Sequence, residues 1–226
     1  MGIIEFNNVY FSYNNIEYIF EDVNLEIPES GITAILGFPS QGKTTLLKLI
    51  KGMLKPTRGR ITVLNIDTSN SIKKQLLFLH RNVSIHFQDT YLISNMNVYD
   101  NLALPLLYNT NLSKLEIEYE IDKILNIFEL QREKYEMPFN LSPTEAKLIS
   151  ISRAFLGNPK IILLDEPFSS LDKYYTLKLL EISEEYSKKS KIILTTSDDN
   201  IANKFNQVIE IIKTNNSNKA VLIEKD

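Results

Sequence analysis

The chain has 226 residues, 43% of them hydrophobic, with 25 Lys and Arg residues against 28 Asp and Glu residues and a formal net charge of −3. This length can bury a sizeable core, and the balanced charge gives no indication of nonspecific binding to nucleic acid. The absence of cysteine excludes disulfides, thiolate catalysis and cysteine–metal sites, and it favours a cytoplasmic protein.

Short β-rich runs fill residues 3–36 and are separated by turn-forming residues at 14–15 and 28–31. They predict a small meander that leads into a strand at residues 32–36, and residues 60–64 predict a further strand. No stretch approaches the roughly 20 apolar residues that cross a bilayer. Residues 1–8 also lack the basic region and apolar core of an export signal. We therefore expect a chain that neither spans a membrane nor is exported.

The segment Gly37-Phe-Pro-Ser-Gln-Gly42-Lys43-Thr44 has the spacing of a phosphate-binding loop. Its glycines let the backbone bend so that successive N–H groups can face phosphate oxygens. Lys43 adds a positive charge, and Thr44 adds a hydroxyl for Mg²⁺. The loop lies between the predicted strand and a predicted helix over residues 45–51, so the N-terminus of that helix would face the bound anion. By itself, such a match can also be a chance turn.

Residues 83–87 predict a buried strand, and the pattern from residue 98 to about residue 156 is helical with polar breaks. Within this segment, Ser113 and Glu116 form a capping box, which indicates the start of a helix. One face of that helix is apolar at helical spacing, which indicates core packing; this face consists of Ile117, Ile121, Ile124, Leu125 and Phe128. The segment is therefore predicted to be a helical insertion.

Four apolar residues at 161–164 are followed by Asp165 and Glu166, so a buried strand would deliver two carboxylates at its carboxyl end. Ligands of open α/β sheets bind at that edge. Asp165 can hold Mg²⁺ through water, and Glu166 can orient and deprotonate the water that attacks a γ-phosphate. Together with the phosphate loop, this pair is a specific signal for nucleotide hydrolysis.

After residue 159 the predicted order is strand, helix and strand, over residues 161–164, 173–187 and 192–196. Strands that alternate with helices imply a mainly parallel sheet covered on both faces. Residues 207–224 contain two β-rich runs separated by a polar turn at residues 215–218, which predicts a hairpin.

These motifs, in this order, resemble those of the ATP-binding cassette family, the nucleotide-binding subunits of ABC transporters, over nearly the whole chain. Tyr13 matches the aromatic residue that stacks on adenine, and Gln88 matches the glutamine that approaches Mg²⁺ and signals to the membrane subunit. Residues 169–172 match the loop that crosses the dimer interface, and Arg153-Ala154 match a pair in the helix before Asp165. Taken singly, Tyr13 would be an ordinary strand aromatic and Gln88 a solvated polar residue.

The resemblance implies a fold and its divisions. The fold would be an α/β P-loop NTPase of the ABC type, with a mainly parallel sheet core, an antiparallel β lobe and a helical insertion. Residues 1–226 would form one nucleotide-binding domain. About residues 1–88 and 158–226 would make the core and β lobe, and about residues 89–157 the helical subdomain.

The resemblance also implies ATP and Mg²⁺ as cofactors and assigns the site residues. Glu166 and Lys43 would be catalytic, with Ser197 as a weak replacement for a switch histidine. Thr44, Gln88 and Asp165 would hold the metal. The nucleotide would contact Tyr13, Gly37, Phe38, Pro39, Ser40, Gln41, Gly42, Lys43, Thr44, Thr45 and Gln88, and Ser142 would reach the nucleotide of a second subunit.

Two departures from the family pattern lie in the loop and at the switch position. In the loop, Ser40 replaces a usual glycine, Gln41 a small residue and Pro39 a residue with an N–H donor, so we expect ATP binding to survive but to weaken. Ser197 stands where the family has histidine. Its hydroxyl can bond a phosphate oxygen or water but cannot carry the positive charge of imidazole, which predicts slower turnover.

The third departure is the family signature Leu-Ser-Gly-Gly-Gln, which is replaced by Leu141-Ser-Pro-Thr-Glu145. In the family this segment caps the γ-phosphate held by the other subunit of a head-to-tail dimer. Here Ser142, Pro143 and Glu145 have the order of a helix cap. A helix N-terminus whose donors are used by its own side chains offers fewer donors to a phosphate. We favour this structural interpretation over a working signature.

Residues 97–107 and 111–117, and Ala146-Lys147 after the signature, look most like ATPases of Mla-type, MCE-linked phospholipid transport, and they also resemble FtsE-type cell-division ATPases. This implies lipid transport from a peripheral position on the inner face of the cell membrane. The implied partners are an integral membrane permease, a second ABC ATPase subunit in a homodimer or heterodimer, and an MCE-domain protein, without nucleic acid. Tyr91 and Tyr99 would either contact the permease or pack in the core.

Two functions remain open at this point. The first is an ATP-hydrolysing motor subunit, which the presence of Glu166 favours. The second is a slowly hydrolysing, ATP-gated structural subunit of a heterodimeric or FtsE-like membrane complex, which Pro143 and Ser197 favour. A DNA-repair or translation ATPase is disfavoured, because the chain has no room for long coiled-coil insertions or a second cassette.

Overall fold

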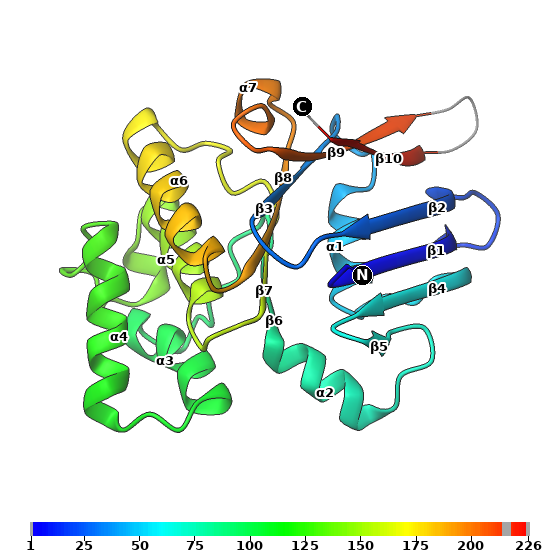
Figure 1. Ribbon diagram of the computed structural model, residues 1–226. Helices are drawn as coiled ribbons and strands as arrows, with labels where there is room; N and C mark the ends of the chain where they lie inside the picture. Colours follow the sequence, from blue (N-terminus) through cyan, green and yellow to red (C-terminus); the bar gives the residue numbers. More distant parts are fainter. Residues whose placement is uncertain (1, 214–217, 225–226) are drawn as a thin grey trace.

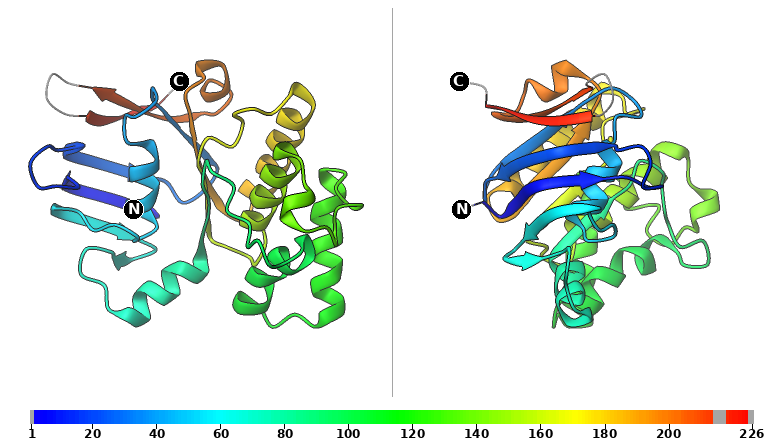
Figure 2. Two further views of the ribbon diagram at one scale, coloured as in Figure 1. Left: turned by 180° about the vertical axis from the view of Figure 1, so that it is seen from behind. Right: turned by 90° about the vertical axis from the view of Figure 1, so that its right-hand side faces the viewer.

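A computed structural model describes residues 2–213 and 218–224 of the chain, with side chains described up to residue 212. Its strands form one sheet in the order β5-β4-β1-β2-β10-β9-β3-β8-β7-β6. The antiparallel strands β1, β2 and β4 lie on one side of the molecule and helices α3 to α6 on the other, as Figure 1 shows. The same division is visible from behind in Figure 2.

The antiparallel half of the sheet consists of β1 (Ile4–Phe11), β2 (Phe20–Ile27), β4 (Arg58–Val63) and β5 (Ile66–Asp67). β1 pairs with β2 and with β4, and β4 pairs with β5, all antiparallel. Along β1 and β2, buried apolar residues alternate with more exposed and mostly polar residues, as a half-buried strand requires, apart from one two-residue interruption in each strand. The predicted strand near residues 60–64 is confirmed as β4.

The parallel half consists of β3 (Ile32–Leu36), β6 (Val83–His86), β7 (Ile161–Leu164), β8 (Lys191–Thr196) and β9 (Gln207–Lys213). β3 pairs in parallel with β8 and β9, and β7 pairs in parallel with β6 and β8. β7 and β8 are buried along their whole length. This confirms the predicted parallel sheet, because strands covered on both faces read as continuous apolar runs.

The predicted C-terminal hairpin is present as β9 paired antiparallel with β10 (Asn218–Glu224), and residues 215–217 of its predicted turn lie outside the described residues. β10 also touches β2, so the hairpin stands between β2 and β3 in the sheet. β1 and β2 pair antiparallel, as the predicted meander requires, but the meander does not continue into an adjacent β3. β3 does not pair with β2, because its neighbours on both sides are the distant strands β8 and β9.

Helices cover the sheet and fill the segment between β6 and β7. Among them, α2 has no counterpart in the predicted elements, and only Leu79 of its ten residues is buried. The helices are α1 (Lys43–Ile50), α2 (Lys73–Asn82), α3 (Val98–Asn109), α4 (Lys114–Ile127), the 3₁₀ turn η1 (Pro138–Asn140), α5 (Pro143–Phe155), α6 (Lys173–Ser187) and α7 (Asp199–Ala202). Within residues 2–213 and 218–224, none is long and apolar enough to cross a membrane.

The predicted start and apolar face of α4 are both confirmed. Ser113 and Glu116 form the reciprocal bonds of a capping box. The predicted apolar face is buried from Ile117 to Phe128 and belongs to a core shared by α3 to α6 and one face of the parallel strands. A second core lies on the other face of those strands, around α1 and the antiparallel half. The helices of the insertion thus share one core with α6 and with one face of the parallel strands.

Candidate functional site

The phosphate loop connects β3 to α1, as predicted. Its last glycine, Gly42, is the N-cap of α1 with φ +94°, and a Cβ there would lie 2.8 Å from Ile19 and 2.9 Å from Phe20. The left-handed backbone conformation and the lack of room for a Cβ atom both require glycine at position 42. Because Gly42 has no side chain, the first amides of α1 have no side-chain cap and can meet an anion.

Two of the unusual loop residues have visible consequences. Ser40, at the position of a usual glycine, has φ +66°, a left-handed conformation that is strained for serine. The Gln41 side chain folds across the loop, and its Oε1 accepts a hydrogen bond from the Phe38 amide at 2.7 Å. The amide of Phe38 is thus bonded within the protein, and Pro39 has no N–H.

Lys43 lies at the centre of a compact polar cluster. Its side chain is buried, and Nζ donates to Gly37 O at 2.6 Å and to Ser197 Oγ at 2.9 Å. Nζ also lies 3.0 Å from Glu166 Oε1. Ser197 Oγ in turn donates to the same Glu166 oxygen at 2.7 Å. The structure therefore brings together all three residues that were predicted to be catalytic.

Asp165 and Thr44 meet beside this cluster. Thr44 Oγ1 donates to Asp165 Oδ2 at 2.6 Å, and Thr195 Oγ1 donates to Asp165 Oδ1 at 2.7 Å. A hydroxyl and a carboxylate are oxygen ligands of the type that Mg²⁺ prefers, and Mg²⁺ is commonly held by one carboxylate together with phosphate oxygens and water. Within the described residues, three or more His, Cys, Asp or Glu side chains do not gather into a metal cluster. The residues present fit a Mg²⁺ that is shared with a nucleotide.

Gln88, the third predicted metal ligand, lies in an exposed bend after β6. β6 is paired with β7, with His86 opposite Leu164, so Gln88 emerges at the same sheet edge as Asp165. Its approach to a metal stays a prediction.

Tyr13 lies near the first turn of α1. Its ring is 60% exposed and packs edge-on against Phe11 at a centroid distance of 4.9 Å. Its hydroxyl shares a hydrogen bond of 3.1 Å with Thr45 Oγ1. An exposed ring held beside the phosphate loop is suitably placed to stack on a base, and that contact remains a prediction.

Ser142 caps α5, as the helix-cap interpretation predicted. Ser142 Oγ accepts from the Glu145 amide at 3.3 Å, and Glu145 Oε2 accepts from the Ser142 amide at 2.7 Å. The Ala146 amide donates to Ser142 O at 3.0 Å, and Pro143 has no N–H. The amide of Thr144 is therefore the remaining donor of the first turn. α1 differs from α5 in this respect, because its N-cap Gly42 provides no side-chain cap.

The two histidines do not replace a switch residue. His80 is exposed, on α2. His86 is buried, its Nδ1 lies 3.0 Å from Ser150 Oγ, and burial lowers its pKa to about 3. Both agree with the structural or exposed roles predicted for them. Of the two predicted alternatives for the tyrosines, Tyr91 is exposed and Tyr99 packs against the core.

Two residues of the cluster were not predicted. Thr195 bonds both Asp165 and the Glu166 amide, and Lys147 bonds the Glu166 carbonyl. In the sequence, Thr195 is a threonine near the end of an apolar strand, and Lys147 is a lysine on the apolar side of a predicted helix. Neither becomes informative until the neighbouring elements are in place.

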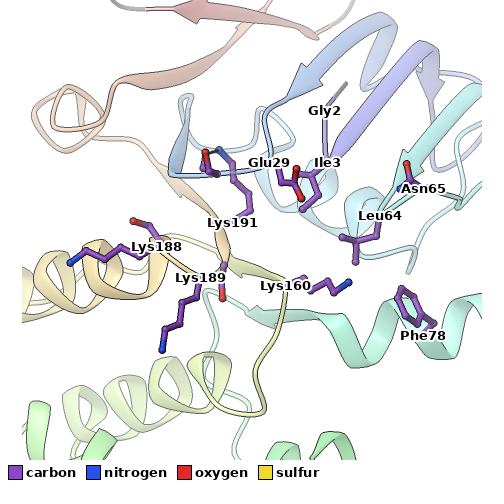
Figure 3. A pocket seen from close by; sticks show the side chains of 13 residues that line it. Gly2, Ile3, Glu29, Leu64, Asn65, Phe78, Lys160, Lys188, Lys189 and Lys191 are labelled. Atoms are coloured by element: carbon purple, nitrogen blue, oxygen red, sulfur yellow. Dashed lines mark hydrogen bonds between the residues drawn. The ribbon is translucent and has the colours of Figure 1, made fainter.

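A cavity of about 590 Å³ lies at the opposite edge of the sheet, beside Lys160 and Lys191, which precede or begin β7 and β8. Lysines 160, 188, 189 and 191 line it, and in Figure 3 their side chains point in different directions. Lys191 is buried and bonded to Ser30 O and Gln207 Oε1. The lysines of this cavity therefore do not converge on one point, unlike the polar groups around Lys43.

Comparison with known proteins gives consistent matches. A sequence profile of the family described as "ABC transporter" matches residues 20–169. The methionine import ATP-binding protein MetN of Vibrio vulnificus (strain YJ016) is 33% identical over 192 residues, which are 85% of this chain and 56% of that protein. MetN of Histophilus somni (strain 129Pt) is 32% identical over 208 residues, 91% of this chain and 58% of that protein. The chain thus spans less than two thirds of the length of these relatives.

Solved structures agree with the fold. The dimeric bacterial ABC transporter cassette MJ0796 superimposes with a TM-score of 0.83 at 28% identity, covering 92% of this chain and 93% of that one. A dimeric post-hydrolysis state of the same cassette, bound to ADP and Pi, gives a TM-score of 0.85 at 26% identity and covers 99% and 100%. The predicted fold class is confirmed. The relatives named above are methionine import ATP-binding proteins, so they do not support the expected Mla-type kinship, lipid transport or MCE-domain partner.

Proposed function

This chain belongs to the ABC transporter family, and on that premise we propose that it is an ATP-hydrolysing subunit that drives a separate membrane permease. The observation that carries the proposal is the cluster in which Lys43 and Ser197 bond the Glu166 carboxylate, next to the contact of Thr44 with Asp165. A base, a cation and a metal-binding pair are thus collected around one uncapped helix N-terminus.

Each residue has a distinct role in this proposal. Lys43 and the first amides of α1 bind the β- and γ-phosphates, because they supply positive charge and N–H donors. Glu166 accepts the proton of the attacking water, and Ser197 orients the Glu166 carboxylate through their hydrogen bond. Thr44 and Asp165 hold Mg²⁺, with Gln88 as a further ligand. When bound, Mg²⁺ neutralises charge that develops on the phosphates. Tyr13 stacks on the adenine.

We further propose that the chain works in a dimer and that its altered signature weakens one contact. At the start of α5, the Ser142 and Glu145 amides are bonded to each other's side chains. This leaves the Thr144 amide for a phosphate on another subunit. A heterodimer with an intact partner signature would preserve full capping of this chain's own nucleotide. In a homodimer both sites would lack it, and turnover would be slow.

The alternative is a slowly hydrolysing, ATP-gated structural subunit. The contact of Ser197 with Glu166 favours the motor, because Ser197 still orients the proposed base. The capped start of α5 favours the structural subunit. The double variant Pro143→Gly with Thr144→Gly tests this point: restored turnover in the isolated chain is expected if the missing glycines limit hydrolysis. An unchanged rate would assign the slow step elsewhere.

For the cargo, we propose methionine or a similar amino acid, imported through a permease at the inner face of the cell membrane. Support comes from the names of the relatives, at 32% to 33% identity. The curated proteins that match this chain number 2903, so transport itself is the test of the cargo. The resemblance to phospholipid-transport ATPases rests on short apolar segments alone.

The experiment is uptake into proteoliposomes that contain the chain, its genomic neighbour permease and internal ATP. Methionine uptake coupled to phosphate release is the expected result. Lys43→Ala should abolish both, because it removes the cation of the phosphate loop, whereas Lys55→Ala, which changes an exposed lysine after α1, should not. Lipid movement without methionine uptake would overturn the cargo proposal. Absence of ATP-dependent transport of either kind, with ATP bound, would favour the structural subunit.

A further inference from the structure

The backbone of Glu166 has an unusual conformation. Its φ is +46°, which is left-handed, and the next residue is Pro167. A left-handed conformation is unfavourable for a residue with a side chain, and a residue before proline prefers an extended conformation. Such strain persists only where the surroundings hold it in place, and it is concentrated at functional sites. Bonds from neighbouring elements must therefore fix this turn.

One bond comes from β8 and reaches the N–H side of Glu166. Thr195 follows Leu194, which is opposite Leu164 in the pairing of β7 and β8. Its buried hydroxyl accepts from the Glu166 amide at 2.8 Å and donates to Asp165 Oδ1 at 2.7 Å. A hydroxyl can do both at once, and a methyl group can do neither.

The other bonds come from α5 and reach the carbonyl side. Lys147 is buried, and its Nζ donates to Glu166 O at 3.0 Å, to Ser169 O at 2.6 Å and to Ser169 Oγ at 2.7 Å. Ser169 closes the turn by donating to Glu166 O through Oγ at 2.9 Å and through its amide at 3.2 Å. The three N–H donors of the ammonium group thus have three acceptors.

We propose that Thr195 and Lys147 are positioning residues that clamp the backbone of Glu166 from both sides and so aim its carboxylate at Ser197 and Lys43. The proposal rests on the proposed role of Glu166 as the base. Both residues act through the Glu166 backbone, so neither needs to contact the nucleotide. Loss of either bond lets the strained turn relax toward an extended conformation, which moves the carboxylate away from its partners.

The two residues differ in a useful way. Thr195 also bonds Asp165, so its loss changes the metal-binding carboxylate as well as the clamp. The bonds of Lys147 go to Glu166 and Ser169, so its loss changes the clamp without touching Asp165. The clamp therefore predicts that replacing either residue slows turnover. It also predicts that only the replacement of Thr195 changes the dependence of turnover on Mg²⁺ concentration.

The variants are Thr195→Val and Lys147→Met, each with a matched control. Thr33→Val removes a buried threonine hydroxyl from neighbouring strand β3, where it donates to Gln207 Oε1 at 2.8 Å, away from the site. Lys191→Met removes a second buried lysine, and burial lowers the pKa of both lysines to about 8. Thr195→Ser, which keeps the hydroxyl, is the rescue variant.

We expect kcat for ATP hydrolysis to fall about tenfold or more in Thr195→Val and Lys147→Met, while the Kd for ATP changes less than about twofold. The controls should keep kcat even where they lower Tm, and Thr195→Ser should recover most of the activity. Amide hydrogen exchange at Glu166 should accelerate in Thr195→Val but not in Thr33→Val, because the Glu166 amide loses its acceptor. Unchanged exchange at Glu166 would overturn the clamp, and so would equal kcat in the variants and their controls if Glu166→Gln itself is slow.

Failure of the proposed function gives a different result. In that case Glu166→Gln would hydrolyse ATP as fast as the unmodified chain. Hydrogen exchange needs no hydrolysis, so it tests the clamp in either case. Protection of the Glu166 amide that is lost in Thr195→Val supports the clamp. Protection that persists in Thr195→Val overturns the clamp.

Discussion

Lys51 allows a quantitative prediction about pH and stability. It ends the helix that begins at the phosphate loop, and its buried Nζ donates to His80 O at 3.1 Å and to Val83 O. Both acceptors are neutral carbonyl groups, and burial lowers the pKa of Lys51 from 10.5 to about 8. In the unfolded chain the pKa returns to its ordinary value of about 10.4. We predict that Lys51→Met removes a pH-dependent part of the free energy of unfolding.

The sign follows from proton binding. Between about pH 8 and about pH 10.5 the unfolded state binds more protons at Lys51 than the folded state, so stability rises with pH over this window. A pKa difference of about 2.5 corresponds to about 3 kcal/mol in total, of which about 1.5 kcal/mol accumulates between about pH 8 and about pH 9.5. Below about pH 7, roughly one unit under the folded-state pKa, the two states bind this proton almost equally, and the contribution is constant.

The assay is urea unfolding at a series of pH values for the unmodified chain, Lys51→Met and Lys55→Met, in which an exposed lysine nearby is replaced. The free energy of unfolding of the unmodified chain minus that of Lys51→Met should increase by about 1.5 kcal/mol over that interval. The comparison with Lys55→Met should show no such increase. If plots of the free energy of unfolding against pH are parallel for the unmodified chain and Lys51→Met, the reasoning that burial without a counter-charge lowers the pKa of Lys51 is refuted.

Three further changes test other parts of the structure. Ser142→Ala should lower the free energy of unfolding by about 1 kcal/mol in urea, because it removes the cap of α5; no loss would contradict the capping bonds to Glu145. Tyr13→Ala should weaken ATP binding about tenfold in a nucleotide titration, because base stacking contributes about 1–3 kcal/mol, whereas Tyr13→Phe, which loses the Thr45 bond but keeps the ring, should bind within about threefold. Equal loss in both Tyr13 variants would contradict stacking. Ile124→Ala should cost about 2–5 kcal/mol in urea, because it opens a cavity in the helical core, and a loss under about 1 kcal/mol would contradict its burial.

Local spacing predicted the parts of the site that lie on consecutive residues. The glycines around Lys43 and the strand that ends in Asp165 carry their chemistry within a few positions, and the structure brings them together at one sheet edge. The cap of α5 was likewise readable from Ser142 and Glu145, because both partners of the bonds lie in one turn.

Contacts between distant elements were not predictable in the same way. Thr195 reaches Glu166 only because β8 pairs with β7 in one register, and Lys147 reaches it only because α5 turns that face toward the strand end. The place of β3 in the sheet depends on the hairpin of β9 and β10, which comes from the other end of the chain. Residues 73–82 form a helix with a single buried residue, and its apolar residues stand together at positions 76–79, a short run that does not by itself distinguish a helix from a strand.

Single-turnover and steady-state phosphate release with Glu166→Gln test the central claim most directly. The control is Glu181→Gln, which changes an exposed carboxylate on α6. If Glu166 is the general base, its loss should slow hydrolysis about a hundredfold or more while ATP binding stays within about twofold, because general-base catalysis contributes roughly 10²–10⁴. Glu181→Gln should behave like the unmodified chain. Hydrolysis by Glu166→Gln at the rate of the unmodified chain would contradict the account of an ATP-hydrolysing motor.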